Sequence, residues 1–366
     1  MNRCPACGTK YSDDAKFCTR DGSKLIAIAA APGDAADPTR SPSTAPPPRG
    51  TAHGRGEAHA PVTPTNLVGR DLDGRYLIEK KVGEGGMSFV YLATDIATKE
   101  PYAIKVLSHA LSHDQNAMQR LKREASLGMR LAHPNVCHII RMGETQDGLV
   151  YVVMPFVSGE ILSDRNNRMG TLPLAEVSRF VTQIAAGLHV AHELKIVHRD
   201  LKPENIMICK SEDAAERAVV MDFGLAKERR ADAELQKLTA TGIILGTPEF
   251  MSPEQLRGKP LDPRTDIYSL ALMTYEMLTG KLPFTGRTQQ EMMIARLRNE
   301  PVPLRQARSD LELPEAAEKV LAKAMQRNPD DRYTTAPEFA AAMSAACERK
   351  SGEGSGVGRL GRLFGR

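Results

Sequence analysis

One eight-residue run constrains this chain more than any other feature of its sequence. It reads His198-Arg199-Asp200-Leu201-Lys202-Pro203-Glu204-Asn205. A strand-like segment follows at residues 206–208, and a second apolar segment, 219–221, leads into Asp222-Phe223-Gly224. Carboxylate and amide oxygens on short loops beside strands are ligands that Mg²⁺ prefers, together with substrate phosphates. The pattern therefore predicts two neighbouring loops that hold magnesium and a phosphorylated compound.

A glycine-rich segment between two predicted strands is a second phosphate signal. It reads Gly83-Glu84-Gly85-Gly86-Met87-Ser88, and glycines let backbone N–H groups approach a phosphate without an intervening side chain. The strand-to-strand context argues against the dinucleotide-binding fingerprint, which opens a helix. Lys105 lies on the next apolar strand, where a lysine is costly unless it is paired or faces a cleft. Glu124, in the predicted helix that follows, offers the partner charge.

The order of the predicted elements indicates two lobes. β-rich runs at residues 76–82, 89–93 and 102–106 come first, and helical patterns dominate later, at 119–131, 174–194 and beyond 252. Strands followed by helices favour an α+β fold. We expect four segments: a cysteine-marked piece at residues 1–25, a disordered Ala/Pro-rich linker at 26–71, a folded domain at 72–347 and a flexible basic tail at 348–366.

The composition is typical of a soluble cytoplasmic protein. Of the 366 residues, 41% are hydrophobic and 26% are charged, as in ordinary globular chains. The net charge of +4 is spread along the length, so we expect no nucleic-acid binding. No apolar run approaches the roughly 18 residues of a transmembrane helix, and no secretory signal is visible. Cys137, Cys209 and Cys347 are scattered singly, as reduced core thiols are.

Residues 72–347 resemble the eukaryotic-type (Hanks-type) serine/threonine protein kinases and are most similar to their bacterial branch. The resemblance rests on the eight-residue run, on Asp222-Phe223-Gly224 and on the glycine-rich loop, which occur in the family's order. It implies a bilobal protein kinase fold, with a small β-rich N-lobe and a large α-helical C-lobe. It also implies transfer of the ATP γ-phosphate, with Mg²⁺ or Mn²⁺, to serine and threonine hydroxyls of protein substrates in signalling.

The resemblance also implies roles for single residues. Asp200 would accept or orient the substrate hydroxyl, Lys202 would stabilise the γ-phosphate, and Lys105 would hold the α- and β-phosphates while paired with Glu124. Asn205 and Asp222 would hold Mg²⁺. The ATP site would be formed by Val82, Gly83, Gly85, Val90, Ala103, Lys105, Met154 (the gatekeeper position), Val157 and Met207.

Positions farther from the loops match the family or depart from it. Arg332 would be the buried partner of Glu254, and Asp266 would anchor the backbone of the catalytic loop. Gly128 falls where the family often packs a hydrophobic side chain behind the catalytic site. A glycine there weakens both helix and packing, so we expect the active arrangement to need outside support. Ser88 in place of the loop's third glycine costs little.

The segment between Asp222 and Glu254 predicts a regulatory switch. It contains Thr239 and Thr241, which match the positions autophosphorylated in similar bacterial kinases. Arg199 directly precedes Asp200, and a phosphothreonine would give this cation an anionic partner and order the segment. The alternative is that both threonines are solvent-facing loop hydroxyls.

The first 25 residues look like a short zinc ribbon. Two ligand pairs at two-residue spacing are present, Cys4 with Cys7 and Cys18 with Asp21. Zinc accepts carboxylate oxygen, so a Cys₃Asp site is feasible, and so short a segment needs metal to fold. We expect Zn²⁺ and a role in partner docking or sensing. A cysteine-bearing disordered tail is the alternative.

Two rival functions and the C-terminal tail complete the hypotheses. A pseudokinase scaffold predicts loss of a catalytic lysine, aspartate or metal ligand, all of which this chain has. A zinc-ribbon nucleic-acid binder predicts a basic patch with stacking aromatics, whereas residues 1–25 offer only Tyr11 and Phe17 alongside acids. In the tail, Leu360, Leu363 and Phe364 fall at helical spacing beside arginines. That pattern suits contact with an anionic membrane or partner, or an exposed frayed end.

Overall fold

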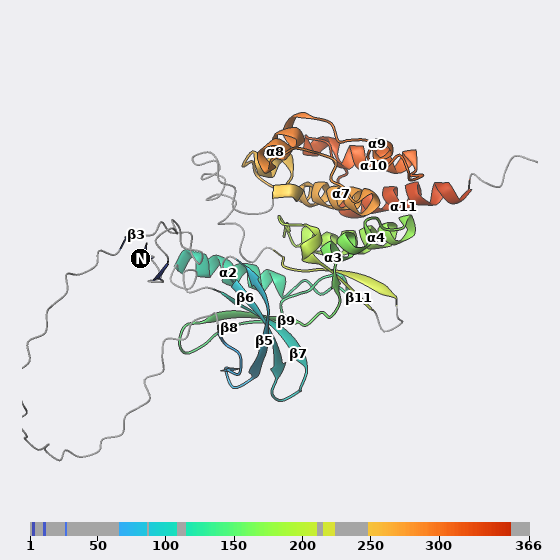
Figure 1. Cartoon of the computed structure of the whole chain (residues 1–366). Coiled ribbons are helices and arrows are strands. Elements are labelled where there is room, and N and C mark those ends of the chain that lie inside the picture. Colours follow the sequence, from blue (N-terminus) through green and yellow to red (C-terminus); the bar gives the residue numbers. More distant parts are fainter. Residues whose placement is uncertain are drawn as a thin grey trace, which may run out of the picture. The chain divides into compact units, whose positions relative to one another are not determined.

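The computed structural model describes residues 2–3, 10–11, 26–27, 66–85, 88–107, 115–210, 215–223 and 248–352 (Figure 1). The chain divides into two units, Met1–Ala58 and His59–Arg366. The first unit holds a small antiparallel sheet in the order β2-β1-β3, formed by β1 (Asn2–Arg3), β2 (Lys10–Tyr11) and β3 (Ile26–Ala27). The four predicted zinc ligands, Cys4, Cys7, Cys18 and Asp21, lie outside the described residues.

The second unit begins with a six-stranded antiparallel sheet, the N-lobe sheet, in the order β4-β5-β6-β7-β9-β8. Its strands are β4 (Asp71–Leu72), β5 (Tyr76–Gly85), β6 (Ser88–Asp95), β7 (Pro101–Leu107), β8 (Arg141–Glu144) and β9 (Val150–Pro155). The three predicted β-rich runs are confirmed as β5, β6 and β7. Lys105 lies on β7 between Val90 on β6 and Val152 on β9, so both of its neighbours are central strands.

Successive residues of the N-lobe strands face opposite sides of the sheet, as the period of a strand requires. Ile104 is buried with Tyr91 in the apolar cluster on one face. Its neighbour Ala103 is buried on the other face, in a cluster that includes apolar residues of α2 (Gln115–Gly128). The second face is the one on which the predicted ATP residues gather.

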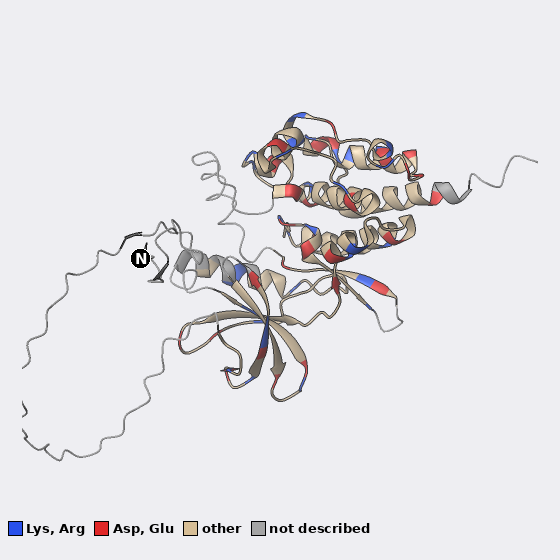
Figure 2. Cartoon of the chain, in the orientation of Figure 1, with Lys and Arg blue, Asp and Glu red and all other residues tan. Residues whose placement is uncertain are grey.

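Helices dominate the chain after residue 161 and form the C-lobe (Figure 1). They are α3 (Leu162–Met169), α4 (Leu174–Glu193), α6 (Pro253–Leu256), α7 (Arg264–Thr279), α8 (Gln289–Arg298), α9 (Leu304–Ala307), α10 (Glu315–Ala324) and α11 (Ala336–Gly352), with the 3-10 turns η1 (Pro203–Asn205), η2 (Pro248–Phe250) and η3 (Pro329–Asp331). Acidic and basic residues are interspersed over these helices (Figure 2). Within the described part of the chain, no helix has both the length and the apolar character to cross a membrane.

Helix α7 is the central element of the C-lobe. It packs against α4, α10 and α11, and every residue from Thr265 to Tyr275 is buried. A helix that is buried on all sides needs apolar side chains all round, and most of α7 is Leu, Met, Ile, Ala and Tyr. Asp266 is an exception, so its carboxylate requires buried partners.

A small sheet positions the two loops that are predicted to hold magnesium. β10 (Glu160–Ile161), β11 (Ile206–Lys210) and β12 (Glu216–Val220) pair antiparallel in that order. Ile206 opposes Val220, so the loop before β11 and the loop after β12 meet at one end of the hairpin. Sequence-distant residues are thereby brought together.

Candidate active site

The loops at the end of the β11–β12 hairpin hold three predicted site residues side by side. Met221 N donates to Asn205 O at 2.8 Å, which ties the two loops together. The Asn205 amide nitrogen donates to the backbone O of Asp200 at 2.7 Å and to its Oδ2 at 3.2 Å. Lys202 Nζ lies 3.6 Å from the same Oδ2. Because the amide nitrogen is used in this way, the Asn205 amide oxygen remains as the atom that can ligate a metal.

Lys105 reaches this loop cluster from the N-lobe sheet. Its Nζ lies 2.7 Å from Asp222 Oδ1, and the lysine is buried while the Asp222 side chain is 42% exposed. A buried ammonium requires an opposite charge of this kind. Glu124, the predicted partner, lies in α2, but its side chain is outside the described part of the chain. The Lys105–Glu124 pair therefore stays a prediction.

Asp266 anchors the catalytic loop from α7, as predicted. Its carboxylate accepts from His198 N at 2.8 Å, from Arg199 N at 3.0 Å and from His192 Nε2 at 2.8 Å. Burial alone would raise the pKa of Asp266, but the hydrogen bonds from His192 and the loop outweigh it and lower that pKa. Arg199 has a left-handed φ of 65°, a strained conformation for a residue other than glycine. The bond to Asp266 helps to hold it.

His198 joins the two loops through its imidazole ring. Nε2 donates to Met221 O at 2.9 Å, and Nδ1 accepts from Asp200 N at 3.3 Å. The ring also contacts Phe223 edge-on, with centroids 4.8 Å apart. Both nitrogens are used, so the ring fixes the spacing between Asp200 and the Asp222 loop.

The end of the segment that follows Asp222 is held by a buried ion pair, as predicted. Arg332 Nη1 and Nη2 each donate to one Glu254 oxygen at 2.7 Å, and Thr265 donates to the same carboxylate at 2.8 Å. Burial raises the pKa of Glu254, but Arg332 more than offsets it, and the pKa is lowered. Gln255 Nε2 donates to Arg199 O at 2.7 Å. This contact places α6 directly beside the catalytic loop.

Arg296 on α8 is a residue that the sequence reasoning missed. It is fully buried and donates to three backbone carbonyls, those of Pro248 at 2.6 Å, Glu249 at 2.5 Å and Met251 at 3.0 Å. Burial lowers the pKa of the guanidinium. Arg298 on the same helix is exposed, so nothing in the composition of α8 distinguishes the two arginines. Arg296 holds η2 and the residue that follows it.

The predicted ATP residues converge on one apolar cluster. Ala103 and Met154 are buried in this cluster, and Val90, Val157 and Met207 are half-buried and pack against the cluster. Ala103 and Met154 also oppose each other in register on β7 and β9. Of the remaining predicted ATP residues, Val82, Gly83 and Gly85 lie in β5. Val82 is exposed, Gly83 opposes Val90, and Gly85 opposes Ser88 on β6.

The space beside Gly128 is filled rather than weakly packed, which corrects the prediction. A Cβ at Gly128 would lie 2.7 Å from Ile139 Cδ1. The cavity left among Gly128, Cys137, Ile139 and Phe223 is only about 10 Å³, roughly the minimum that admits one water. Ile139 therefore supplies, from a separate segment, the side chain that position 128 lacks.

Other predicted groups fall outside the described residues, Thr239 and Thr241 among them. Arg199, the predicted partner of a phosphothreonine, is described and lies in the catalytic loop. Among the described residues, no group of three or more His, Cys, Asp and Glu could hold a metal ion. The zinc site and the threonine switch therefore stay predictions.

The β-rich N-lobe, the helical C-lobe and the paired loops between them define a protein kinase fold. The protein kinase domain family matches residues 76–345, and the chain belongs to this family. It is 36% identical over 278 residues to the serine/threonine-protein kinase pkn3 of Myxococcus xanthus, across 76% of this chain and 51% of that protein.

Solved structures agree with this assignment. The kinase domain of Mycobacterium tuberculosis PknI matches with a TM-score of 0.59 and 28% identity, over 76% of this chain and 98% of that chain. Rad53 1–466, in complex with AMP-PNP, matches with a TM-score of 0.59 and 26% identity, over 73% of this chain and 64% of that chain. The chain spans about half or less of the length of the first curated relatives that it matches.

Proposed function

We propose that this chain is a serine/threonine protein kinase that transfers the γ-phosphoryl group of ATP to hydroxyls of other proteins. The observation that carries the proposal is the convergence of Lys105, Asp222, Asn205 and Asp200 on one loop pair. Phosphoryl transfer needs positioning and charge neutralisation more than covalent chemistry. The buried Asp266 supplies the positioning by fixing two consecutive N–H groups of the loop.

The residues divide the work of the reaction. The Asp200 carboxylate accepts the proton of the substrate hydroxyl, and Lys202, 3.6 Å from it, neutralises charge on the transferred group. The half-exposed carboxylate of Asp222 and the amide oxygen of Asn205 suit Mg²⁺, and the bound metal neutralises phosphate charge. When ATP is bound, the Lys105 ammonium contacts the α- and β-phosphates in addition to Asp222.

The adenine is held by the apolar cluster around Ala103 and Met154. Val90, Val157 and Met207 pack against this cluster, and Gly83 on β5 opposes Val90 on β6. Support for nucleotide binding also comes from Rad53, which is similar to this chain and was solved with AMP-PNP. Free thiols at Cys137, Cys209 and Cys347 fit a cytoplasmic enzyme.

Autophosphorylation tests the proposal. Wild type, Asp200→Asn and the surface control Asp310→Asn are incubated with ATP and Mg²⁺, and the sites are mapped by mass spectrometry. Loss of the general base lowers the initial rate by about 100-fold or more, whereas the control leaves it unchanged. No incorporation by wild type would favour the scaffold function. Incorporation by Asp200→Asn at the wild-type rate would refute the role of Asp200.

The same mapping tests the switch at Thr239 and Thr241. A phosphate on either residue pairs with Arg199 and orders the segment before η2. The double variant Thr239→Ala/Thr241→Ala then loses most of its activity toward an added protein substrate. Unchanged activity in that variant would reject the switch.

The N-terminal unit binds zinc through Cys4, Cys7, Cys18 and Asp21 and docks a partner. The strands described in this unit are two residues each, and a segment as short as residues 1–25 needs metal to fold. The metal content of the full chain decides between a zinc-binding segment and a cysteine-bearing disordered tail. We expect one zinc per chain in wild type and less zinc in Asp21→Ala. Absence of zinc from the wild type would refute the zinc site.

A further inference from the structure

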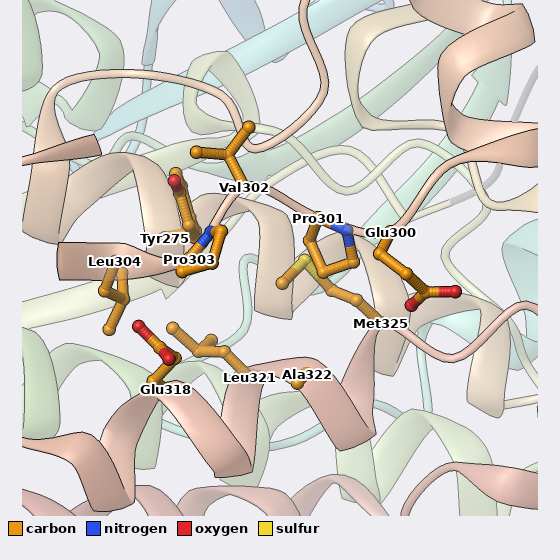
Figure 3. Close-up of a pocket in the computed structure, with 10 residues that line it drawn as sticks. All are labelled: Tyr275, Glu300, Pro301, Val302, Pro303, Leu304, Glu318, Leu321, Ala322 and Met325. Carbon is orange, nitrogen blue, oxygen red and sulfur yellow. The ribbon is translucent and has the colours of Figure 1, made fainter. Parts of the chain in front are cut away.

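The C-lobe contains a surface pocket on the side of α7 that carries Tyr275. The pocket has a volume of about 140 Å³ and lies between the segment that leads into α9 and helix α10 (Figure 3). Its apolar walls are formed by Pro301, Val302, Pro303, Leu304, Leu321 and Met325. None of the residues of the proposed active site lines it.

The volume suits one phenyl ring. An apolar cavity of about 150 Å³ in a protein core binds benzene, and this pocket is of that size. A proline pair and branched side chains form rigid walls, so the pocket is shaped before anything enters it. Its natural occupant is therefore one aromatic or large aliphatic side chain.

Two glutamates border the pocket, which adds a charge requirement. Glu300 and Glu318 lie at opposite ends of the lining (Figure 3). Glu300 is exposed and pairs with Arg327 at 2.7 Å. Glu318 accepts the backbone N–H of Arg305 at 3.4 Å, and no basic side chain in the described part of the chain forms an ion pair with it. An apolar group flanked by cations fits this border.

Tyr275 lines the pocket and carries a buried hydroxyl. Its side chain is 1% exposed, and its phenolic oxygen has no hydrogen-bond partner among the described residues. A buried hydroxyl without a partner costs about 1–3 kcal/mol. Because this oxygen is buried, a carbonyl of a bound peptide reaches it only if the pocket wall shifts.

The tail of this chain has the matching chemistry. It contains Arg362-Leu363-Phe364-Gly365-Arg366. In an extended peptide, residues two apart face the same side, so Phe364 would enter a pocket with one arginine on each side of it. Helix α11 ends at Gly352 and packs against α10, which carries Glu318. The twelve residues from Gly352 to Phe364 can span up to about 40 Å.

We propose that Phe364 of the same chain occupies this pocket, with Arg362 and Arg366 paired to Glu300 and Glu318. The tail thereby becomes a strap across α10 and the segment before α9. Because the two partners are tethered, the effective concentration of the tail at the pocket is in the millimolar range. The strap is independent of the proposed kinase activity.

Hydrogen exchange of the full chain tests the strap. In wild type, the backbone N–H groups of residues 302, 304, 305 and 318–325 exchange more slowly than in Phe364→Ala. The difference is about tenfold or more, because burial of one phenyl ring contributes a free energy of that size. The double variant Glu300→Arg/Glu318→Arg likewise loses the protection, and the same pair combined with Arg362→Glu and Arg366→Glu regains it. Glu312→Arg, an exposed acid outside the lining, keeps the wild-type protection.

A peptide assay gives a second readout that does not depend on the folding of pocket variants. A labelled peptide of residues 355–366 is titrated into the full-length Phe364→Ala chain, whose pocket is empty. It binds at least tenfold more tightly than the same peptide with Phe364→Ala. Equal binding of both peptides, or unchanged exchange in Phe364→Ala, overturns the proposal. Binding of the peptide to vesicles with anionic lipid but not to the protein overturns it in favour of a membrane contact.

Discussion

Replacement of Arg296 by methionine removes the donor from one buried carbonyl and two part-buried carbonyls while keeping most of the side-chain volume. Each carbonyl left without a donor costs about 1–3 kcal/mol. Relief of the buried guanidinium charge offsets part of that cost. We therefore expect the free energy that favours the ordered form of residues 248–251 to fall by roughly 3 kcal/mol, which lowers the equilibrium constant for that form by about 150-fold. This segment continues into α6, which contacts Arg199 through Gln255.

The assay is steady-state phosphorylation of a peptide selected from an arrayed library. We expect kcat/KM for the peptide to fall by about tenfold or more, because the loss acts on the segment beside the catalytic loop. The KM for ATP should stay within twofold, since Arg296 does not contact the nucleotide cluster. Arg298→Met, an exposed arginine on the same helix, is the matched control. Urea denaturation shows whether the whole C-lobe is weakened.

Two results would refute this reasoning. If the peptide kcat/KM of Arg296→Met stays within twofold of wild type, the three hydrogen bonds do not hold the segment in its working form. If the apparent kcat falls in proportion to the folded fraction while the KM values for ATP and peptide stay unchanged, Arg296 acts on global stability alone.

Three other changes have definite expected outcomes. Arg332→Met leaves Glu254 buried without its cation, and we expect the free energy of unfolding in urea to fall by about 3–5 kcal/mol. Burial raises the pKa of Glu276 to about 7; a carboxyl with a raised folded pKa loses stability as the pH rises through that range. Glu276→Gln should therefore be more stable than wild type at pH 8, with the gap in thermal midpoint shrinking toward pH 5. Gly128→Leu collides with Ile139 and should slow autophosphorylation, and the added change Ile139→Ala should restore most of the rate.

Each of these expectations has a contrary result. Full stability of Arg332→Met would mean that water replaces the buried pair. A stability gap for Glu276→Gln that does not change with pH would exclude titration as its cause. Failure of Ile139→Ala to restore Gly128→Leu would show that the two positions do not share one space.

Local signals in the sequence were enough to predict the strands β5, β6 and β7. The Glu254–Arg332 pair and the anchoring by Asp266 were predicted from the resemblance to the kinase family, which assigns a partner to each of these charged residues. Arg296 was not, because its partners are backbone carbonyls, which leave no trace in the side-chain pattern. The Gly128 prediction failed in its packing part because Ile139, eleven residues away, turns its side chain into the gap. The Lys105–Asp222 contact depends on the distance between the two lobes, which no local pattern records.

Asp266 also affects how fast two backbone amide hydrogens of the catalytic loop exchange with solvent. The N–H groups of His198 and Arg199 belong to an irregular loop, yet both donate to a carboxylate within the central helix of the C-lobe. Their exchange requires that the loop and α7 separate, and α7 is buried over most of its length. We expect these two amides to exchange at the rate of global unfolding, like amides of the core. The shape of the catalytic loop would then persist through every local opening of the lobes and be lost only with the fold itself.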